Sequence, residues 1–319
     1  MGQSLTETNF KFADNQQRYQ GKVRDVYAIN DQVVLVATDR ISAFDVVSKQ
    51  GIPYKGQVLN QIAAFNLEAT KDIVPNWVQS VPDPNATVGV KAEVFKVEVI
   101  MRRMLVGGAW RSYSSGSRNL SGNIVPDGMV ENEAFSEPLL TPSTKATEGH
   151  DEDISAEEII KQGLATEAEW QTISNYAHQL FERGNQIAGK QGLILVDTKY
   201  EFGKLPDGSI ILVDEIHTPD SSRYFYADDY DARFKAGEAP RQLSKEFVRE
   251  WLLDQNYKGQ NPDWPEMPDE FIEQITERYI ELYEQLTGKS FVPADYNDIE
   301  NRITNSIKSN LNRISIKRY

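Results

Sequence analysis

The sequence predicts an α+β fold, because strand-like and helical segments gather in different parts of the chain instead of alternating regularly. Short apolar runs bounded by turn residues dominate the first 105 residues, which is typical of strands. Helical periodicity begins near residue 155, and strands return at 193–215. We therefore expect a β-rich lobe at 1–105 and a mixed lobe at 106–319, which face each other across a cleft in one continuous unit.

The N-terminal part contains two clear strand signals. Residues 23–29 and 33–38 are apolar runs separated by an Asn-Asp pair, which suits the turn of a hairpin. Residues 93–105 alternate between apolar side chains and charged ones, among them Glu98 and Arg102. This alternation predicts a strand with one buried face and one polar face.

The middle of the chain, residues 106–150, is rich in Gly, Ser, Pro and Thr and shows no periodicity. A stretch of that length inside a compact domain is more often a functional loop than a spacer, so we expect a loop here. Two capping boxes, Ser155 to Glu158 and Thr166 to Glu169, then predict helix starts. The further helices are predicted from 166 to about 190, at 245–255 and at 270–287. The tail at 301–319 is predicted as a closing amphipathic helix with a solvated basic face, because Ile299, Ile303, Ile307 and Leu311 recur every four positions.

Composition limits the possible functions. The net charge is −14, from 48 acidic and 34 basic residues, and such a field repels nucleic acid and anionic membranes. No apolar run approaches the roughly 18 residues that a membrane span needs. The chain has no cysteine, which excludes disulfides and thiolate chemistry and fits a reducing cytoplasm. We expect a cytoplasmic protein with small-molecule ligands and with neither a nucleic-acid nor a membrane partner.

A pair of carboxylates is the most informative local pattern. Residues 193–202 are predicted as a strand with Asp197, Lys199 and Glu201 on one face. An Asp-Gly pair after it predicts a two-residue hairpin turn, which places Glu201 opposite Asp214. Opposed carboxylates repel each other, and Mg²⁺ carried by a nucleotide would relieve the repulsion. The alternative is an exposed hairpin whose register differs by one residue.

Two weaker signals suit bound phosphate. Gly21-Lys22 precedes a strand, where backbone N–H groups could approach a triphosphate. The segment TPDSSR at 218–223 offers hydroxyls, turn N–H groups and a guanidinium. Neither G-x-x-x-x-G-K-[ST] nor G-x-G-x-x-G occurs. The chain also lacks an H-x-x-x-H pair and a G-x-S-x-G elbow, so neither a zinc site nor a serine hydrolase is predicted.

Six motifs, taken together, resemble those of a known family. In chain order they are GKVRDVY at 21–27, TDRISAFDVV at 38–47, VEVIMRR at 97–103, TPSTKATEGHDEDIS at 141–155, LVDTKYEFG at 195–203 and VDEIHTPDSSRYF at 213–225. They resemble phosphoribosylaminoimidazole-succinocarboxamide synthase, also called SAICAR synthetase. The loop at 141–155 and the C-terminal extension resemble the longer forms of this family.

The resemblance implies an ATP-dependent ligase of de novo purine biosynthesis. Such a ligase joins the carboxylate of carboxyaminoimidazole ribonucleotide (CAIR) to the amine of L-aspartate through an acyl phosphate, and it releases SAICAR, ADP and phosphate. The resemblance also implies a SAICAR-synthase-like fold with an antiparallel-sheet N-terminal lobe similar to the small lobe of kinases. The C-terminal lobe would be ATP-grasp-like, with ATP and Mg²⁺ in the cleft. We expect a monomer or a small homo-oligomer.

The same resemblance implies roles for the matching residues. ATP and Mg²⁺ would be bound by Lys22, Val23, Arg24, Lys145, Lys199, Glu201 and Asp214, the metal by the last two. The substrates would be bound by Asp39, Ser42, Asp45, Glu98, Arg102, Asp220, Ser221 and Arg223, with the arginines at the phosphate of CAIR. The candidate catalytic residues are Lys145, Lys199 and Arg223.

One departure from the family pattern concerns a substrate contact. Gly107-Gly108 stands where we expect Gly-Ser, so a hydroxyl that could bind the substrate phosphate is missing. Either a neighbouring hydroxyl replaces it, from Ser112, Ser114 or Ser115, or the affinity for CAIR is lower. Two other functions stay open. The chain could be an ATP-dependent kinase or ligase acting on another small acid, or a nucleotide-binding regulator without turnover.

Overall fold

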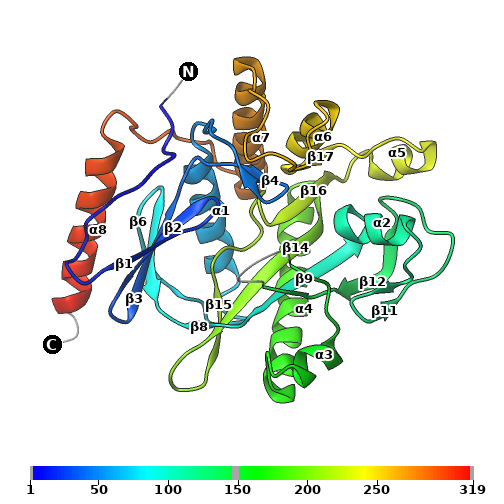
Figure 1. The fold of residues 1–319 in the computed structure, drawn as a ribbon, viewed down its shortest axis with the longest axis horizontal. Helices are drawn as coiled ribbons and strands as arrows, with labels where there is room; N and C mark the ends of the chain where they lie inside the picture. Colours follow the sequence, from blue (N-terminus) through cyan, green and yellow to red (C-terminus); the bar gives the residue numbers. More distant parts are fainter. Residues whose placement is uncertain (1–2, 146–150, 317–319) are drawn as a thin grey trace. The chain divides into compact units, whose positions relative to one another are not determined.

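The computed structural model describes residues 3–145 and 151–316, and Figure 1 labels its elements. The chain forms two compact units, each made from separate stretches of sequence. Unit 1 comprises Met1–Phe65, Trp77–Lys91 and Ser244–Tyr319, and unit 2 comprises Asn66–Asn76 and Ala92–Leu243.

These units differ from the two lobes expected from the sequence. The expected boundary near residue 105 falls inside unit 2, because the strand that ends at Met104 pairs with the strand at Leu193–Lys204. The C-terminal helices belong to unit 1 together with the N-terminal strands. Contacts between distant parts of the chain therefore define the units, and a division by sequence position alone could not find them.

Unit 1 is organised around an antiparallel sheet of five strands in the order β1-β2-β3-β7-β6. The predicted first hairpin is confirmed, because Ile29 pairs with Gln32 and leaves a two-residue turn. Asn30 in this turn has a φ of 55°, as such turns require. The strands are β1 (Gln17–Gln20), β2 (Arg24–Ile29), β3 (Gln32–Ala37), β6 (Val78–Asp83) and β7 (Ala86–Val90).

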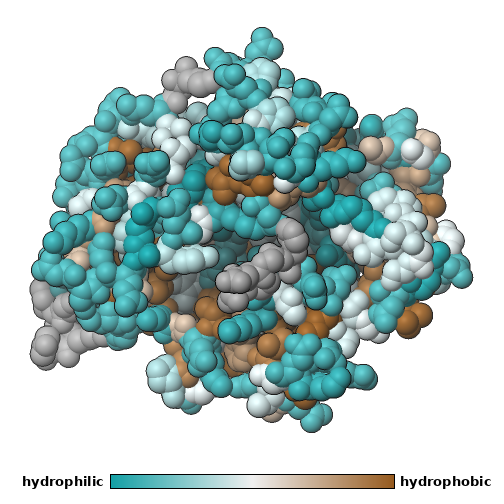
Figure 2. Space-filling view, viewed as in Figure 1, coloured by the Kyte–Doolittle hydropathy of each residue, from teal (hydrophilic) through white to brown (hydrophobic). Residues whose placement is uncertain are grey.

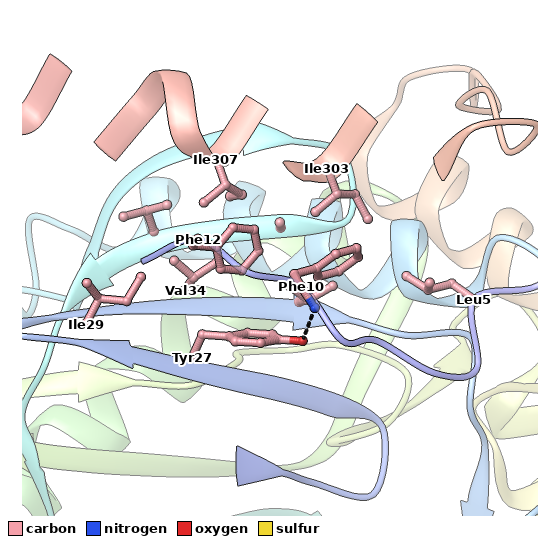
Figure 3. Close-up of a cluster of buried hydrophobic side chains, with 11 residues drawn as sticks. Leu5, Phe10, Phe12, Tyr27, Ile29, Val34, Ile303 and Ile307 are labelled. Carbon is pink, nitrogen blue, oxygen red and sulfur yellow. Dashed lines mark hydrogen bonds between the residues drawn. The ribbon is translucent and has the colours of Figure 1, made fainter. Parts of the chain in front are cut away.

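The C-terminal helix α8 (Ile299–Ile316) packs on this sheet, as the apolar spacing of the tail predicts. Figure 3 shows Ile303 and Ile307 of α8 directed toward Phe12, Phe10 and Tyr27 in one buried cluster. Each buried isoleucine side chain contributes roughly 1.5–3 kcal/mol. The tail is therefore an integral part of the core of unit 1.

The prediction of a solvated basic face on α8 is wrong for Arg302. Its guanidinium donates to both carboxylate oxygens of Asp83, at 3.0 and 3.2 Å, and to the Oδ1 atom of Asn85 at 2.6 Å. Asp83 is buried at the end of β6. The periodicity of the tail cannot reveal this pairing, because the acceptors lie more than 200 residues earlier in the chain.

The other helices of unit 1 are partly predicted. α6 (Glu246–Asp254) and α7 (Asp269–Thr287) lie within a residue of their expected ranges, and α7 ends at Gly288 with a φ of 67°. The sequence does not predict α1 (Lys55–Ala69), which crosses from unit 1 into unit 2. Most of its residues are buried, so its apolar side chains do not form a single stripe.

Unit 2 is built on an antiparallel sheet of eight strands with β14 (Leu193–Lys204) at its centre. β9 (Val97–Met104) pairs with one edge of β14, and β16 (Ser222–Tyr226) pairs with the other. α4 (Glu167–Lys190) packs against β14 and starts at the predicted capping box of Thr166 and Glu169. The remaining strands of this sheet are β8 (Glu93–Val94), β12 (Ala134–Leu140), β13 (Ser143–Thr144), β15 (Ile210–Val213) and β17 (Gln242–Leu243).

The expected loop at 106–150 is wrong for the residues described there. They form α2 (Gly107–Ser114), the small hairpin of β10 (Asn119–Leu120) and β11 (Asn123–Ile124), and the strands β12 and β13. β10, β11 and β13 have two residues each, too few for periodicity to appear in the sequence. β12 has seven residues, but they are exposed or half-buried without alternation, so the period of a strand is absent. The two remaining helices of unit 2 are α3 (Ala156–Lys161), capped by Ser155 as predicted, and α5 (Tyr230–Ala236).

The surface fits the composition. Figure 2 shows hydrophilic residues over most of the face in view. Within the described ranges, no helix combines the length and the apolar character that crossing a membrane requires.

Candidate active site

The strand β14 carries the charged stripe that the sequence predicts. Asp197, Lys199 and Glu201 are alternate residues of this strand, so they share one face of the pleat. Asp197 is 4% exposed and Glu201 is 6% exposed. Buried charges require partners, and these carboxylates find them on β9, on β16 and next to β13. The stripe divides into two clusters, one at Asp197 and one at Lys199 and Glu201.

The first cluster, here called the arginine cluster, consists of Asp197, Arg102 and Arg223. The strand register places Arg102 of β9 and Arg223 of β16 directly beside Asp197. The Nη1 atoms of Arg102 and Arg223 donate to Oδ2 of Asp197, at 2.9 and 2.5 Å. Burial lowers the pKa of Arg102, and so does the like charge of Arg223, while Asp197 opposes both. The three side chains carry a net charge of +1, which suits an additional anion such as phosphate.

The helix α2 begins beside the arginine cluster. A Cβ atom added at Gly107 would lie 2.4 Å from the Nη2 atom of Arg223, so only glycine lets the backbone approach this guanidinium so closely. Gly107 also has a φ of 55°, which favours glycine. Val106 precedes the helix and provides no side-chain cap. A helix N-terminus next to two guanidinium groups is a suitable environment for a phosphate group.

The structure also bears on the missing hydroxyl at Gly108. A Cβ atom there would meet nothing closer than Arg111 Nη2 at 3.8 Å and Arg102 Nη2 at 4.0 Å, so a serine would fit. Ser114 and Ser115 lie at the far end of α2, where their hydroxyls donate to carbonyl oxygens of the same helix. The hydroxyls of these two serines are thus engaged within α2, and replacement of the missing group by Ser112 stays a prediction.

The second cluster, here called the lysine cluster, consists of Glu98, Lys145, Lys199 and Glu201. Lys199 Nζ donates to Glu98 Oε1 at 2.5 Å and contacts Glu201 Oε1 at 3.4 Å. Lys145 pairs with the other carboxylate oxygen of Glu201. The pairing of β13 with β9 explains this meeting, because it sets Ser143 opposite Glu98, two residues before Lys145.

The protonation states of the lysine cluster follow from its charges. Burial lowers the pKa of Lys199, but nearby carboxylates, Glu201 foremost, outweigh burial and raise that pKa above its usual range. Burial would raise the pKa of Glu201, but Lys199 and Lys145 together lower it. Burial raises the pKa of Glu98, and Lys199 opposes this effect. Lys199 is therefore a cation and Glu201 an anion at neutral pH.

The predicted pairing of Glu201 with Asp214 is wrong by one residue. Glu201 pairs with Val213, and the connection between β14 and β15 is the five-residue loop 205–209 rather than a two-residue turn. The side chain of Asp207 closes this loop by accepting from the N–H and the hydroxyl of Ser209. Leu205 N–H donates to the Ser209 carbonyl, so within this loop residues 206–208 form a three-residue turn in place of the predicted Asp-Gly turn.

Asp214 nevertheless belongs to the same electrostatic environment. It follows the last residue of β15 with a φ of 59°, so the alternation of the strand does not continue through it. Its negative charge contributes to the raised pKa of Lys199, as do Glu201 and Glu98. The two acidic residues thus share a cationic neighbour, although they are not paired across the hairpin.

The predicted segment 218–223 forms a turn that leads into β16. Ser221 N–H donates to the Thr218 carbonyl, and the Ser221 carbonyl accepts from Lys199 N–H at 3.1 Å. Asp220 and Ser221 are half-buried in this turn, next to the strand that carries both clusters. His217, just before it, is fully buried and bonds Tyr200 Oη at 2.7 Å.

Six of the predicted residues lie in unit 1. Lys22, Val23 and Arg24 form the turn into β2, and Lys22 Nζ pairs with the Asp45 carboxylate, each side chain being 54% exposed. Asp45 lies in the tight hairpin between β4 (Ser42–Ala43) and β5 (Val46–Val47), where both turn residues have positive φ. The family resemblance assigns Lys22 to ATP and Asp45 to the substrates, and the structure brings these two side chains together.

Asp39 and Ser42 are more enclosed than a substrate-lining position suggests. Asp39 is fully buried and accepts hydrogen bonds from Leu5 N–H at 2.7 Å and from Gly56 N–H, in the first turn of α1, at 2.8 Å. Burial raises its pKa to about 6, although these bonds oppose the shift. Ser42 is 6% exposed. Within unit 1, Asp39 ties the N-terminal segment to the start of α1.

The described residues also limit the kind of metal site. Across 3–145 and 151–316, no three acidic or histidine side chains gather closely enough to hold an ion alone. Glu201 and Asp214 remain suitable donors, because Mg²⁺ needs only one or two carboxylates when phosphate oxygens and water complete its shell. Two carboxylate donors suit a metal that arrives with a nucleotide.

Comparisons with known proteins show the family of this chain. The family model described as SAICAR synthetase matches residues 17–263. The phosphoribosylaminoimidazole-succinocarboxamide synthase of Bacteroides thetaiotaomicron is 57% identical over 313 residues, which cover 97% of this chain and 99% of that protein.

Solved structures of the same family share the fold. The SAICAR synthase from Saccharomyces cerevisiae, complexed with SAICAR, matches with a TM-score of 0.77 at 31% identity over 89% of this chain and 99% of that chain. A type-2 SAICAR synthetase in complex with ADP matches in fold, with a TM-score of 0.67 at 24% identity over 86% of this chain and 100% of the other. The predicted family resemblance and the α+β class are confirmed.

Proposed function

We propose that the charged residues along β14 form the centre of an ATP-dependent ligation. The chain belongs to the SAICAR synthetase family, the ligases that join CAIR to L-aspartate in purine biosynthesis. One observation carries the proposal: the arginine and lysine clusters share one face of one strand, with Asp197 and Glu201 four residues apart. Strand geometry separates such positions by about 13 Å. A ribonucleotide held by its phosphate at the arginine cluster would extend along β14 toward the lysine cluster.

We assign the phosphate of CAIR to Arg102 and Arg223. Planar guanidinium groups bind phosphate oxygens with paired, charge-assisted hydrogen bonds. Asp197 holds both groups in place, at 2.9 and 2.5 Å, so little ordering remains when the ligand binds. The first N–H groups of α2 add donors on the same side. Glu98, Asp220 and Ser221, with Ser42 and Asp45 of unit 1, complete the proposed substrate positions.

We assign the triphosphate of ATP to the lysine cluster and to the turn at Lys22, Val23 and Arg24. Lys145 and Lys199, now paired with carboxylates, would donate to phosphate oxygens. Glu201 and Asp214 would hold Mg²⁺, which supplies charge neutralisation of the phosphates when bound. The related structure in complex with ADP supports a nucleotide as ligand. We assign Asp39 a supporting role, because its carboxylate is occupied by backbone donors.

The proposed chemistry needs no nucleophile from the protein. The CAIR carboxylate attacks the γ-phosphorus of ATP, the bond to the bridging oxygen breaks, and ADP leaves. The amine of aspartate then attacks the acyl carbon, the C–N bond forms, and inorganic phosphate departs while the amine loses a proton to solvent or base. Lys145, Lys199 and Arg223 stabilise negative charge that grows on phosphate oxygens. The absence of cysteine from the chain is compatible with this route.

The test is an ADP-release assay with ATP, Mg²⁺, CAIR and L-aspartate. We expect ADP to form only when both CAIR and aspartate are present, together with SAICAR identified by its mass. Release of ADP without aspartate would indicate a kinase acting on a small acid. A protein that binds ADP but never releases it from ATP would be a regulator. Either result would overturn the proposed ligation.

A pair of substitutions tests the assigned acids. Glu201→Gln and Asp214→Asn are each expected to lower kcat at least 100-fold, about 2.7 kcal/mol of barrier. The melting temperature of Asp214→Asn should stay near that of the wild type. Glu201→Gln removes a buried charge that is paired with Lys145 and Lys199 and should melt lower, so its kcat is measured at a temperature at which the variant is folded. Asp207→Asn, in the exposed loop of the same hairpin, is the matched control and should retain activity. Full turnover in both site variants would remove these residues from the metal assignment.

We further propose that the enzyme works in the cytoplasm as a monomer or a small homo-oligomer. The cysteine-free sequence is compatible with a reducing compartment. Light scattering during size-exclusion chromatography would distinguish a 36.2 kDa monomer from its multiples. Recovery of the native activity in a membrane or periplasmic fraction would contradict the proposed location.

A further inference from the structure

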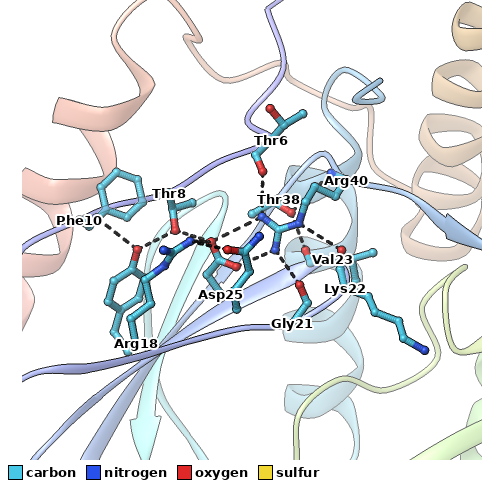
Figure 4. Close-up of polar contacts among 12 residues, drawn as sticks. Thr6, Thr8, Phe10, Arg18, Gly21, Lys22, Val23, Asp25, Thr38 and Arg40 are labelled. Carbon is cyan, nitrogen blue, oxygen red and sulfur yellow. Dashed lines mark hydrogen bonds and ion pairs between the residues drawn. The ribbon is translucent and has the colours of Figure 1, made fainter. Parts of the chain in front are cut away.

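Arg40 of unit 1 is a buried arginine without an assigned function. It is 5% exposed, and its hydrogen bonds appear in Figure 4. Nη2 donates to the Gly21 carbonyl at 3.0 Å, and Nε donates to the Lys22 carbonyl at 3.1 Å. The other bonds go to the Thr6 carbonyl and to both oxygens of Asp25. These are five bonds in total, and a guanidinium has five N–H groups to donate.

The turn that Arg40 holds is fixed from several sides. Gly21 N–H donates to the Arg24 carbonyl at 2.8 Å, which closes the turn. A Cβ atom at Gly21 would lie 2.8 Å from that same oxygen, so the turn requires glycine. The Val23 carbonyl accepts from Thr38, through its hydroxyl at 2.8 Å and its N–H at 3.0 Å. Three consecutive carbonyls, at residues 21 to 23, are thus bound within unit 1.

The same turn leaves donors for a ligand. Lys22 and Val23 N–H groups make no hydrogen bond to any residue in the described parts of the chain. Among the residues that the structure describes, the Lys22 ammonium group pairs with the exposed carboxylate of Asp45 alone, and water screens this pair. Consecutive backbone N–H groups with bound carbonyls, beside a lysine, are the pattern that binds phosphate.

We propose that Arg40 is a positioning residue for the nucleotide. Arg40 holds the turn at residues 21–24 in the shape that presents Lys22 and two backbone N–H groups to the triphosphate. The proposal rests on the proposed assignment of this turn to ATP. The acidic partner Asp25 is fully buried and keeps the guanidinium in place. Arg40 itself touches no ligand in this reading, because all its donors are occupied.

The test compares Arg40→Lys with Arg302→Lys. Lysine keeps the charge but cannot bridge two carbonyls and a carboxylate in a plane. Arg302 is the matched control, because it is also a guanidinium of unit 1 bonded to a buried aspartate, and it does not bond the turn. Calorimetric titration with ADP and Mg²⁺ should show about tenfold weaker binding for Arg40→Lys, about 1.4 kcal/mol. In kinetics, the KM for ATP should rise similarly, while the KM for CAIR stays within twofold.

Lys22→Met separates failure of this proposal from failure of the ATP assignment. If Lys22→Met leaves ADP binding unchanged, the assignment of the turn to ATP is wrong. If Lys22→Met weakens ADP binding while Arg40→Lys binds ADP as tightly as Arg302→Lys does, only the positioning role is wrong. In the double variant of residues 22 and 40, the loss of ADP-binding free energy should be smaller than the sum of the losses in the two single variants, because both residues act through one turn.

A second variant covers the case in which Arg40→Lys does not fold. Gly21→Ala places a methyl group 2.8 Å from the Arg24 carbonyl and must move the turn. We expect the same selective loss of ADP binding, with the KM for CAIR kept. Unchanged ADP binding in a folded Gly21→Ala protein would overturn the proposal.

Discussion

Asp197→Asn is the most informative substitution for the arginine cluster. The Asp197 carboxylate is 4% exposed and accepts from both Arg102 and Arg223. The amide keeps the shape of the side chain but removes the negative charge that both guanidinium groups share, so the repulsion between the two guanidinium groups is no longer offset at this position. Breaking a buried ion pair in this way costs about 3–5 kcal/mol of folding free energy.

The expected change in melting temperature follows from that cost. For a chain of this size, 1 kcal/mol corresponds to roughly 2 °C, so Asp197→Asn should melt about 6–10 °C below the wild type. Asp127→Asn is the control: Asp127 pairs with Arg118, its side chain is 88% exposed, and loss of such a surface pair costs about 0–1 kcal/mol. Differential scanning fluorimetry measures all three proteins under identical conditions.

Added inorganic phosphate distinguishes an anion site from an ordinary structural ion pair. In the variant, phosphate supplies the missing negative charge, so it should raise the melting temperature of Asp197→Asn more than that of the wild type. The control Asp127→Asn should respond as the wild type does. If Asp197→Asn melts within about 2 °C of the wild type, or if phosphate stabilises all three proteins equally, the assignment of these arginines to a phosphate group is refuted.

Two further predictions concern single positions. Gly108→Ser should fold normally, because no neighbouring side chain lies closer than 3.8 Å to the new Cβ. The new hydroxyl adds a donor near Arg102 and should lower the KM for CAIR severalfold. An unchanged or raised KM for CAIR counts against a phosphate at this place. Burial lowers the pKa of His217 to about 3, below its unfolded value near 6.5, so only the unfolded chain binds a proton between these values. The wild type should therefore lose about 1.4 kcal/mol of stability per pH unit below 6.5, relative to His217→Gln. Urea unfolding at pH 7 and pH 5 measures this loss, and an equal change in unfolding free energy in both proteins would contradict the prediction.

Much of the site could be predicted from local patterns. The stripe of Asp197, Lys199 and Glu201 follows from the two-residue period of a strand, and the structure brings it against predicted residues of β9 and β16. Asp197 itself is not among the predicted site residues. Only the pairing of three strands reveals its role, because Arg102 lies 95 positions earlier and Arg223 lies 26 positions later.

Other parts of the fold could not be predicted, for identifiable physical reasons. The helix α1 is buried on most sides, so its sequence lacks a polar face. The two-residue strands within 106–145 are too short to show a period, and the side chains of β12 do not alternate in burial. Arg40 resembles any charged residue near a turn, and only the structure shows that its guanidinium binds the carbonyls of Gly21 and Lys22.

The error at the hairpin shows why the acidic residues could still be identified. A register shift of one residue would normally turn Asp214 to the opposite face from Glu201. The backbone of Asp214, however, has a φ of 59°, and His217 shortly after it has a φ of 57°. Such left-handed residues cost about 1 kcal/mol or more each and persist where surrounding contacts enforce them. The segment therefore leaves the ladder at Asp214, and the Asp214 charge still acts on Lys199. The sequence thus identifies Glu201 and Asp214 as acidic candidates near the strand ends, while the backbone bend at Asp214 determines that its charge acts on Lys199.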